Sequence, residues 1–170
     1  TLSAVYKDYA ARFESYIRTE TQEAKDRKFE SASVDVFNNL VNLVRRTARE
    51  ARDGSFHAEP ALMLVAYAKS IYIKLDVLDG FMRAGHKCLE DKNVSDELNG
   101  LFALLSEGFT DLAGAVVEGR SAGSYQDNLG TKIGELKSLY EVMHSAEGKD
   151  QDYFEDLLAF GAILPLIEDT

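Results

Sequence analysis

The sequence has few of the turn-forming residues that separate short strands from one another. Its 170 residues include two prolines and no tryptophan, and Asn-Gly or Asp-Gly turn pairs are few. An all-β domain needs such turn residues at short, regular intervals. Their scarcity argues against a β-rich fold and favours long helices.

Cysteine and long apolar runs are also scarce. Cys88 is the single cysteine, so the chain forms no internal disulfide, and a reducing, cytoplasmic compartment is the simpler expectation. No uninterrupted apolar run approaches the roughly 18 residues that a bilayer-spanning helix needs, so no membrane span is expected. With 45% hydrophobic and 28% charged residues, the composition is that of a globular chain. The length predicts a single domain over residues 1–170.

Basic residues are fewer than acidic ones, 19 against 29. The formal net charge is −10, which makes nucleic acid and anionic lipid unfavourable main partners. The imbalance lies in residues 57–170, which hold 9 basic and 20 acidic residues, whereas residues 1–56 hold 10 and 9. Any site for an acidic partner is therefore expected in the first third of the chain.

Apolar residues recur at spacings of three and four, which predicts five long helices and a short C-terminal one. The first two are expected to break at residues 29–33, with Ser33 capping the second. Because residues 1–53 contain neither glycine nor proline, one continuous helix is the alternative.

The later helices have clearer ends. The third is expected from Pro60 to Ala84 and is apolar around most of its circumference, which predicts a central, buried helix. Ser95 would begin the fourth helix, and residues 119–123 would end it. The fifth is expected to start near Ser124, and a short sixth follows Gly148 and ends before Pro165.

Short connections between these helices favour an all-α antiparallel bundle in which sequence neighbours pack together. A repeat solenoid is the second choice, because no self-similarity with a period of about 30 to 45 residues occurs. The core is predicted to contain Ile71, Leu75, Leu78, Phe81, Leu105, Leu112, Ile133 and Tyr140.

Residues with catalytic or metal-binding chemistry are scattered. Glu141 and His144 form one Glu-x-x-His pair, but a di-metal bundle needs a second such pair and two further inward carboxylates. His86 and Cys88 lie in one predicted loop and His57 in another, so a zinc site would require all three to converge. No glycine-rich phosphate loop or RNA-binding signature occurs. We expect no catalytic residue, metal or cofactor.

Two features of the predicted helices allow both a structural and a functional interpretation. Lys69, Asp76, Asp79 and Arg83 form a polar stripe on the third helix, which is either its exposed face or the lining of a polar channel. Five glycines lie inside predicted helices and cost stability there. They are Gly100, Gly108, Gly114, Gly130 and Gly134. Gly108 and Gly134 are expected at close helix crossings, and room for a hydrophobic ligand is the alternative.

The N-terminal third carries two candidate interaction surfaces. Tyr6, Tyr9, Phe13 and Tyr16 form an aromatic ladder, which suits either a protein interface or the edge of a core. The second surface is basic: Arg45, Arg46, Arg49 and Arg52, together with Arg18, Lys25 and Lys28 from the polar stretch before them. These cations would bind an acidic protein partner, dock on the chain's own acidic helices, or be solvated.

These features predict a non-enzymatic helical-bundle domain for protein–protein interaction, of the adaptor or scaffold kind. The alternative is a carrier or sensor that binds a hydrophobic small molecule within the bundle, suggested by the glycines and the apolar third helix. A metalloenzyme centred on Glu141 and His144 ranks third.

Overall fold

The part of the chain that the computed structural model describes consists of helices joined by short non-helical segments. That part comprises residues 1–17, 34–51, 56, 58–84, 86–124, 126–145 and 151–168. The α-helices within it are α1 Leu2–Ile17, α3 Val34–Glu50, α4 Ala58–Ala84, α5 Lys92–Glu118, α6 Gln126–Ser145 and α7 Gln151–Glu168, with a 3-10 turn, η1 Lys87–Glu90, before α5. The predicted all-α bundle is confirmed. The choice between a break at residues 29–33 and a continuous helix lies outside the described residues.

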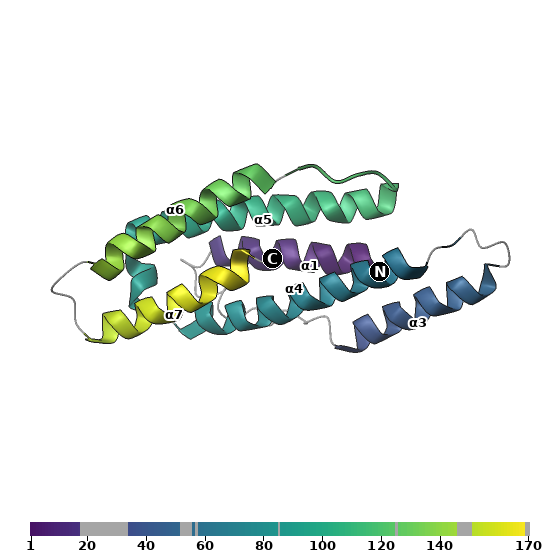
Figure 1. Cartoon of the computed structure of the whole chain (residues 1–170), viewed down its shortest axis with the longest axis horizontal. Helices are drawn as coiled ribbons and strands as arrows, with labels where there is room; N and C mark the ends of the chain where they lie inside the picture. The colour runs from purple at the N-terminus through teal and green to yellow at the C-terminus, as the bar shows by residue number, and fades with distance from the viewer. Residues whose placement is uncertain are drawn as a thin grey trace.

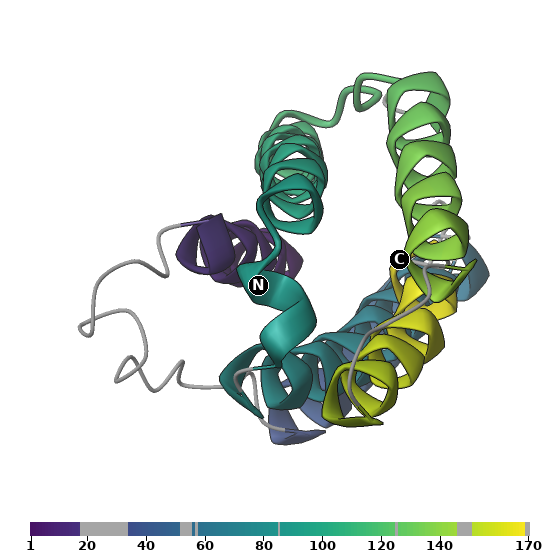
Figure 2. The ribbon, with the colours of Figure 1, turned by 90° about the vertical axis from the view of Figure 1, so that its left-hand side faces the viewer.

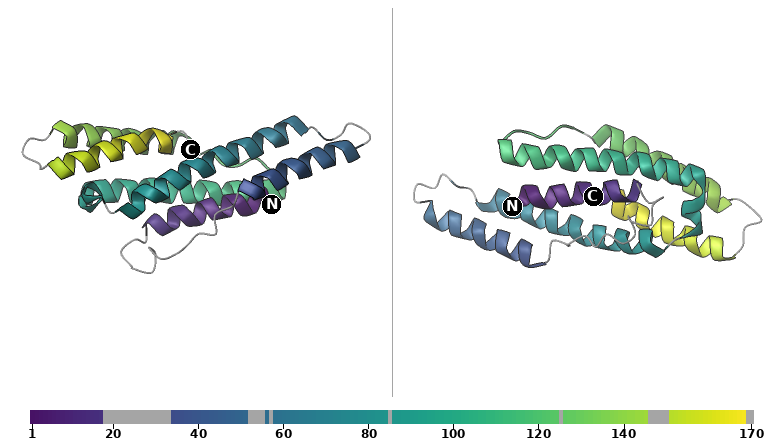
Figure 3. Two further views of the ribbon diagram at one scale, coloured as in Figure 1. Left: turned by 90° about the horizontal axis from the view of Figure 1, so that it is seen from below. Right: turned by 180° about the vertical axis from the view of Figure 1, so that it is seen from behind.

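Five helices contact one another in a closed ring. The order around the ring is α1, α5, α6, α7 and α4, and α4 contacts α1 again (Figures 1 and 2). α3 lies outside the ring and packs on α4 (Figure 3). Among sequence neighbours, α3 packs on α4, α5 on α6 and α6 on α7, each antiparallel as expected (Figure 1). α1 instead packs mainly on α5, and α4 packs on α1, to which it runs parallel, more than on α5.

The aromatic ladder of α1 forms part of the core. Phe13 stacks on Phe109 of α5, with ring centroids 5.9 Å apart, and Tyr6 stacks on the same ring at 6.1 Å. Tyr16 and Phe13 both contact Phe102. Each aromatic ring buries about 150–250 Å². This cluster therefore binds α1 to α5, and the ladder is not a free interface.

The predicted core residues lie inside the bundle or at its edge. Leu75, Leu78, Phe81 and Leu105 are buried, and Ile71, Leu112, Ile133 and Tyr140 are partly buried and pack against the buried cluster. α4 nevertheless is not buried all round, because large apolar side chains on one side of it remain exposed. The predicted central position of α4 is therefore correct for one side of the helix only.

Two helix ends differ from the sequence prediction. α5 begins at Lys92 and not at Ser95, because the Asp91 carboxylate already accepts a hydrogen bond from the Asn93 amide at 2.9 Å and caps the helix. α7 spans 18 residues and continues through Pro165, so the C-terminal helix is longer than predicted. The expected end of α5 is confirmed, since Gly119 has φ +66° and its N–H donates to the Ala115 carbonyl.

Gly134 occupies a different environment from the one expected, and the close crossing expected at Gly108 stays a prediction. A Cβ atom at Gly134 or Gly130 would meet no atom within 4 Å, so the predicted close crossing at Gly134 is wrong. Gly108 lies half-buried within α5. The close approach occurs instead at Gly161 of α7, where a Cβ would lie 2.7 Å from the ring of Tyr140 on α6.

This contrast predicts opposite effects for two glycine-to-alanine changes. Gly161→Ala forces the Tyr140 ring out of its packing and is expected to lower the free energy of unfolding by about 1 kcal/mol or more. Gly134→Ala adds a methyl group in open space and removes a helix-interior glycine, so it is expected to raise that free energy by up to about 1 kcal/mol. Urea titration followed by circular dichroism measures both. Equal effects of the two changes would contradict the α6–α7 contact.

Candidate functional site

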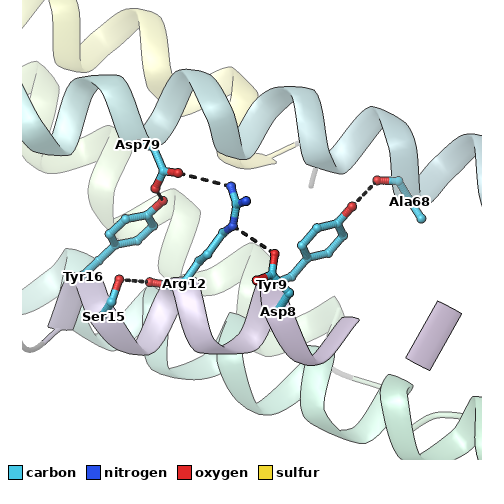
Figure 4. A network of polar contacts seen from close by, with 7 residues as sticks. All are labelled: Asp8, Tyr9, Arg12, Ser15, Tyr16, Ala68 and Asp79. Atoms are coloured by element: carbon cyan, nitrogen blue, oxygen red, sulfur yellow. Dashed lines mark hydrogen bonds and ion pairs between the residues drawn. The ribbon is translucent and has the colours of Figure 1, made fainter. Parts of the chain in front are cut away.

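A buried arginine joins α1 to α4. The Arg12 side chain is 1% exposed, and its Nη1 donates to Oδ2 of Asp79 at 3.2 Å (Figure 4). Its Nε donates to Oδ2 of Asp8, one turn earlier on α1, at 3.2 Å. The guanidinium also lies 5.5 Å from the ring centroid of Tyr72, and the Tyr16 hydroxyl donates to Oδ1 of Asp79. One ion pair thus anchors a polar network between two helices.

The same burial keeps the tyrosines of this region protonated. Burial, followed by the charge of Asp79 and the hydrogen bond to it, raises the pKa of Tyr16. Burial also raises the pKa of Tyr9, whose hydroxyl donates to the Ala68 carbonyl at 2.6 Å (Figure 4). A phenol that holds its proton so firmly is a poor acid or base at neutral pH. The network is therefore suited to holding α1 against α4 and not to proton transfer.

This network corrects the interpretation of the polar stripe on α4. Asp76 and Arg83 are exposed and Lys69 is half-buried, but Asp79 is buried. Asp79 binds Arg12 and Tyr16 of α1. The stripe is thus neither one exposed face nor the lining of a channel. Arg12, the residue that determines this outcome, was not among the predicted site residues.

A second cluster forms where η1 meets α7. Nδ1 of His86 lies 2.8 Å from Oδ1 of Asp156, and the His86 ring stacks on Phe81 with centroids 4.3 Å apart. The Cys88 thiol donates to the Asp156 carbonyl at 3.6 Å. His86 and Cys88 were considered together with His57 as possible zinc ligands, and His57 lies outside the described residues. The contact between His86 and Asp156 was not predicted, because the two residues are 70 positions apart in the chain.

Cys88 is poorly suited to nucleophilic chemistry. Its side chain is fully buried, and burial, with a smaller contribution from the charge of Asp156, raises the pKa of the thiol to about 11. Reactive cysteines have the opposite property, a lowered pKa and access to solvent. The cluster is therefore a packing contact that holds η1 against α7.

The Glu-x-x-His pair lies on α6. Glu141 and His144 are both exposed, and the His144 ring contacts Tyr140 at a centroid distance of 5.9 Å. Among the residues that the structure describes, no three His, Cys, Asp or Glu side chains are grouped closely enough to hold a metal ion. The structure brings no third ligand to this pair within that part of the chain.

The arginines of α3 point away from the bundle. Arg45, Arg46 and Arg49 are exposed, and Nε of Arg46 forms an ion pair with Oε1 of Glu50 at 2.7 Å. In the described part of the chain, neither Arg45 nor Arg49 has an ion pair with a carboxylate. These arginines therefore do not dock on the chain's own acidic helices. The other predicted members of the basic surface, Arg18, Lys25, Lys28 and Arg52, lie outside the described residues.

A groove of about 720 Å³ lies between α1 and α5, beside the loop that follows α5. Most of its lining is polar: Glu14, Ser106, Glu107, Thr110, Asp111 and Arg120, with Ile17 and Ala103. Arg120 donates to Asp111 at 2.6 Å, and this hydrogen bond lowers the pKa of the Asp111 carboxyl. The Gly123 amide donates to the same carboxylate. These contacts fold the loop back on α5 along the edge of the groove.

Two further findings bear on the character of the chain. In its described residues, α5 is long and apolar enough to cross a membrane, but buried core helices meet the same criterion, so the absence of a membrane span stays a prediction. Comparisons with protein families, curated proteins and solved structures give no significant match.

The buried ion pair predicts a strong asymmetry between single and combined substitutions. Arg12→Met alone leaves Asp79 charged and buried, which is expected to cost about 3–5 kcal/mol of unfolding free energy. Arg12→Met combined with Asp79→Leu and Tyr16→Phe removes all three polar groups together and is expected to recover most of that loss. Urea denaturation of both variants tests this. A loss below about 1 kcal/mol for the single variant would contradict burial of the pair.

Cys88 is predicted to be inert in the folded protein. At pH 8, a thiol with a pKa near 11 is ionised only to about 0.1%, compared with tens of per cent for an ordinary cysteine. Alkylation by iodoacetamide, followed by mass spectrometry, should therefore be at least about a hundredfold slower in the folded chain than in the same chain unfolded in urea. Similar rates in the two states would show that the thiol is exposed.

Proposed function

We propose that this chain is a non-enzymatic protein–protein interaction domain, of the adaptor or scaffold kind, and that α3 binds an acidic segment of its partner. The observation that carries the proposal is the exposed ridge formed by Asn38, Asn42, Arg45 and Arg49. These residues follow one another at spacings of four, three and four, so they line one side of α3. We call them the α3 ridge.

The chemistry of the α3 ridge suits carboxylates. An arginine guanidinium presents a fork of N–H donors that matches a carboxylate group, and it keeps its charge at every physiological pH. The asparagine amides add further donors along the same line. An acidic helix or strand laid along α3 would therefore meet a hydrogen-bond donor about once per turn.

The charge of the rest of the chain supports an acidic protein partner at this place. Residues 57–170 carry 20 acidic and 9 basic residues, so the surface away from α3 repels an acidic segment. Electrostatic steering would then direct encounters toward α3. Nucleic acid carries far more negative charge than a peptide, and the net charge of −10 opposes it.

The geometry favours this function over the alternatives. Six of the eight residues that line the groove between α1 and α5 have polar or charged side chains, and Gly130 and Gly134 adjoin open space in place of a ligand-sized cavity, which favours the interaction domain over a carrier of hydrophobic molecules. The groups with catalytic potential take part in packing contacts: Cys88 is buried and His86 is stacked on Phe81.

A charge-reversal pair tests the α3 ridge. Arg45→Glu with Arg49→Glu is expected to weaken binding of a fluorescent poly-glutamate probe by about tenfold or more, measured by anisotropy at low salt. The control is Lys7→Glu with Lys92→Glu, which makes the same change of net charge at exposed positions on α1 and α5. The control is expected to weaken binding by less than about twofold.

The outcomes separate a site from a general charge effect. Loss of binding in the α3 variant alone supports the proposal. Equal loss in both variants would mean that binding follows net charge, and no binding by the parent chain would remove acidic segments as the partner class. Both variants should keep the parent's melting temperature, because all four side chains are exposed.

A further inference from the structure

α4 carries a second unusual surface, a line of exposed positions that alternate at spacings of three and four. The central members are Met63, Ala66, Ser70, Ile73, Val77 and Gly80, and Glu59 and Ala84 extend the line at its two ends. Met63, Ile73 and Val77 are each at least 50% exposed. A repeat of 3.5 residues is the spacing with which one helix packs along another. We call this line the α4 seam.

We propose that the α4 seam binds the α4 seam of a second copy of this chain, with the two helices antiparallel and a twofold axis between Ser70 and Ile73. This contact goes beyond the proposed function of α3, because it uses a different helix and a different partner. An isologous pairing of this kind requires that the seam be complementary to itself.

The side chains of the seam complement one another in size in this register. Three pairs face each other across the axis: Met63 with Gly80, Ala66 with Val77, and Ser70 with Ile73. Each large side chain thus meets a small one. Gly80 has no atom within 4 Å of the position of a Cβ, which leaves room for Met63 of the second copy. A parallel pairing would instead place glycine against glycine and isoleucine against isoleucine.

The charges beside the seam favour the same direction. In antiparallel helix pairs, flanking positions on the same edge face each other. That rule places Lys69 opposite Asp76 of the second copy. Glu59 belongs to the seam itself and faces Ala84 of the second copy, so it lies beside Arg83 of that copy. A parallel pair would instead bring Lys69 next to Lys74 of the second copy, a contact between like charges. Opposite charges therefore support the antiparallel register, and like charges oppose the parallel one.

The size of the contact indicates how tight the dimer should be. α4 has 27 residues and is about 40 Å long, and a contact about one helix diameter wide covers roughly 400–500 Å² on each copy. The total of roughly 800–1,000 Å² is smaller than the roughly 1,200–2,000 Å² of stable specific interfaces and is in the range of weak, transient ones. The dimer is therefore expected to dissociate on dilution in the micromolar range.

Sedimentation velocity from about 1 to about 200 µM tests the dimer. The parent chain should shift from monomer to dimer over this range. Ile73→Lys places a charge on the axis of the seam and should stay monomeric. Val142→Lys is the matched control, because Val142 is 67% exposed on α6, and it should dimerise like the parent. A parent chain that stays monomeric at the highest concentration, or an Ile73→Lys variant that dimerises normally, would overturn the proposal.

Oxidative cross-linking tests the direction of pairing. Ser70→Cys lies about 5 Å along the helix axis from its own equivalent in the antiparallel pair, so it should form a covalent dimer. Met63→Cys lies about 25 Å from its equivalent and should not. The parent chain is the negative control and should not cross-link, because its one cysteine, Cys88, is buried. Efficient cross-linking of Met63→Cys, or of neither variant, would contradict the antiparallel register. Neither experiment involves the α3 ridge, so failure here leaves the acidic-partner proposal standing.

Discussion

The contact between Arg12 and Asp79 is the interaction on which the arrangement of helices depends. The aromatic packing of α1 on α5 is apolar and tolerates small slides and rotations, whereas hydrogen-bonded charges do not. Two nitrogens of Arg12 bind Asp8 and Asp79, and Tyr16 binds the second oxygen of Asp79. These directional bonds fix the height and rotation of α1 against α4 and so close the ring of five helices.

The closed ring determines which sides of α4 remain available. α1 contacts the side that carries Ala68 and Asp79, α3 packs beside Tyr72 through Phe37, and Phe160 of α7 stacks on Phe81. The α4 seam lies on a side that none of these contacts covers. Burial of the exposed apolar side chains of the seam against another apolar surface would lower the free energy, because it removes them from water. The α3 ridge and the α4 seam are therefore two separate surfaces, for which we propose an acidic partner and a second copy of the chain.

The local spacing of apolar residues predicted where the α-helices lie in the sequence. It did not predict which faces of these helices contact one another. Spacings of three and four predicted every described α-helix but not the 3-10 turn η1, which falls in the segment expected to be a loop. Gly119 marked the end of α5, because its left-handed φ favours glycine. Asp79 was misread because its partner Arg12 lies 67 positions away, and the Asp156 partner of His86 was missed for the same reason. The exposure of α4 was also missed, since composition measures how apolar a helix is and not how much of it the neighbouring helices cover. The exposure of the α3 arginines could be foreseen as one of several alternatives, and the structure selected among them.

The central claim is that α4 keeps one side available for another copy of the chain. Hydrogen–deuterium exchange of the parent at about 2 and about 200 µM measures this most directly, because exchange reports local opening of each helix. Peptides from residues 63–84 should exchange more slowly at the higher concentration, while peptides from α6 should exchange equally at both. Identical exchange of α4 at the two concentrations, or an equal slowing of all the helices, would contradict a specific contact along α4.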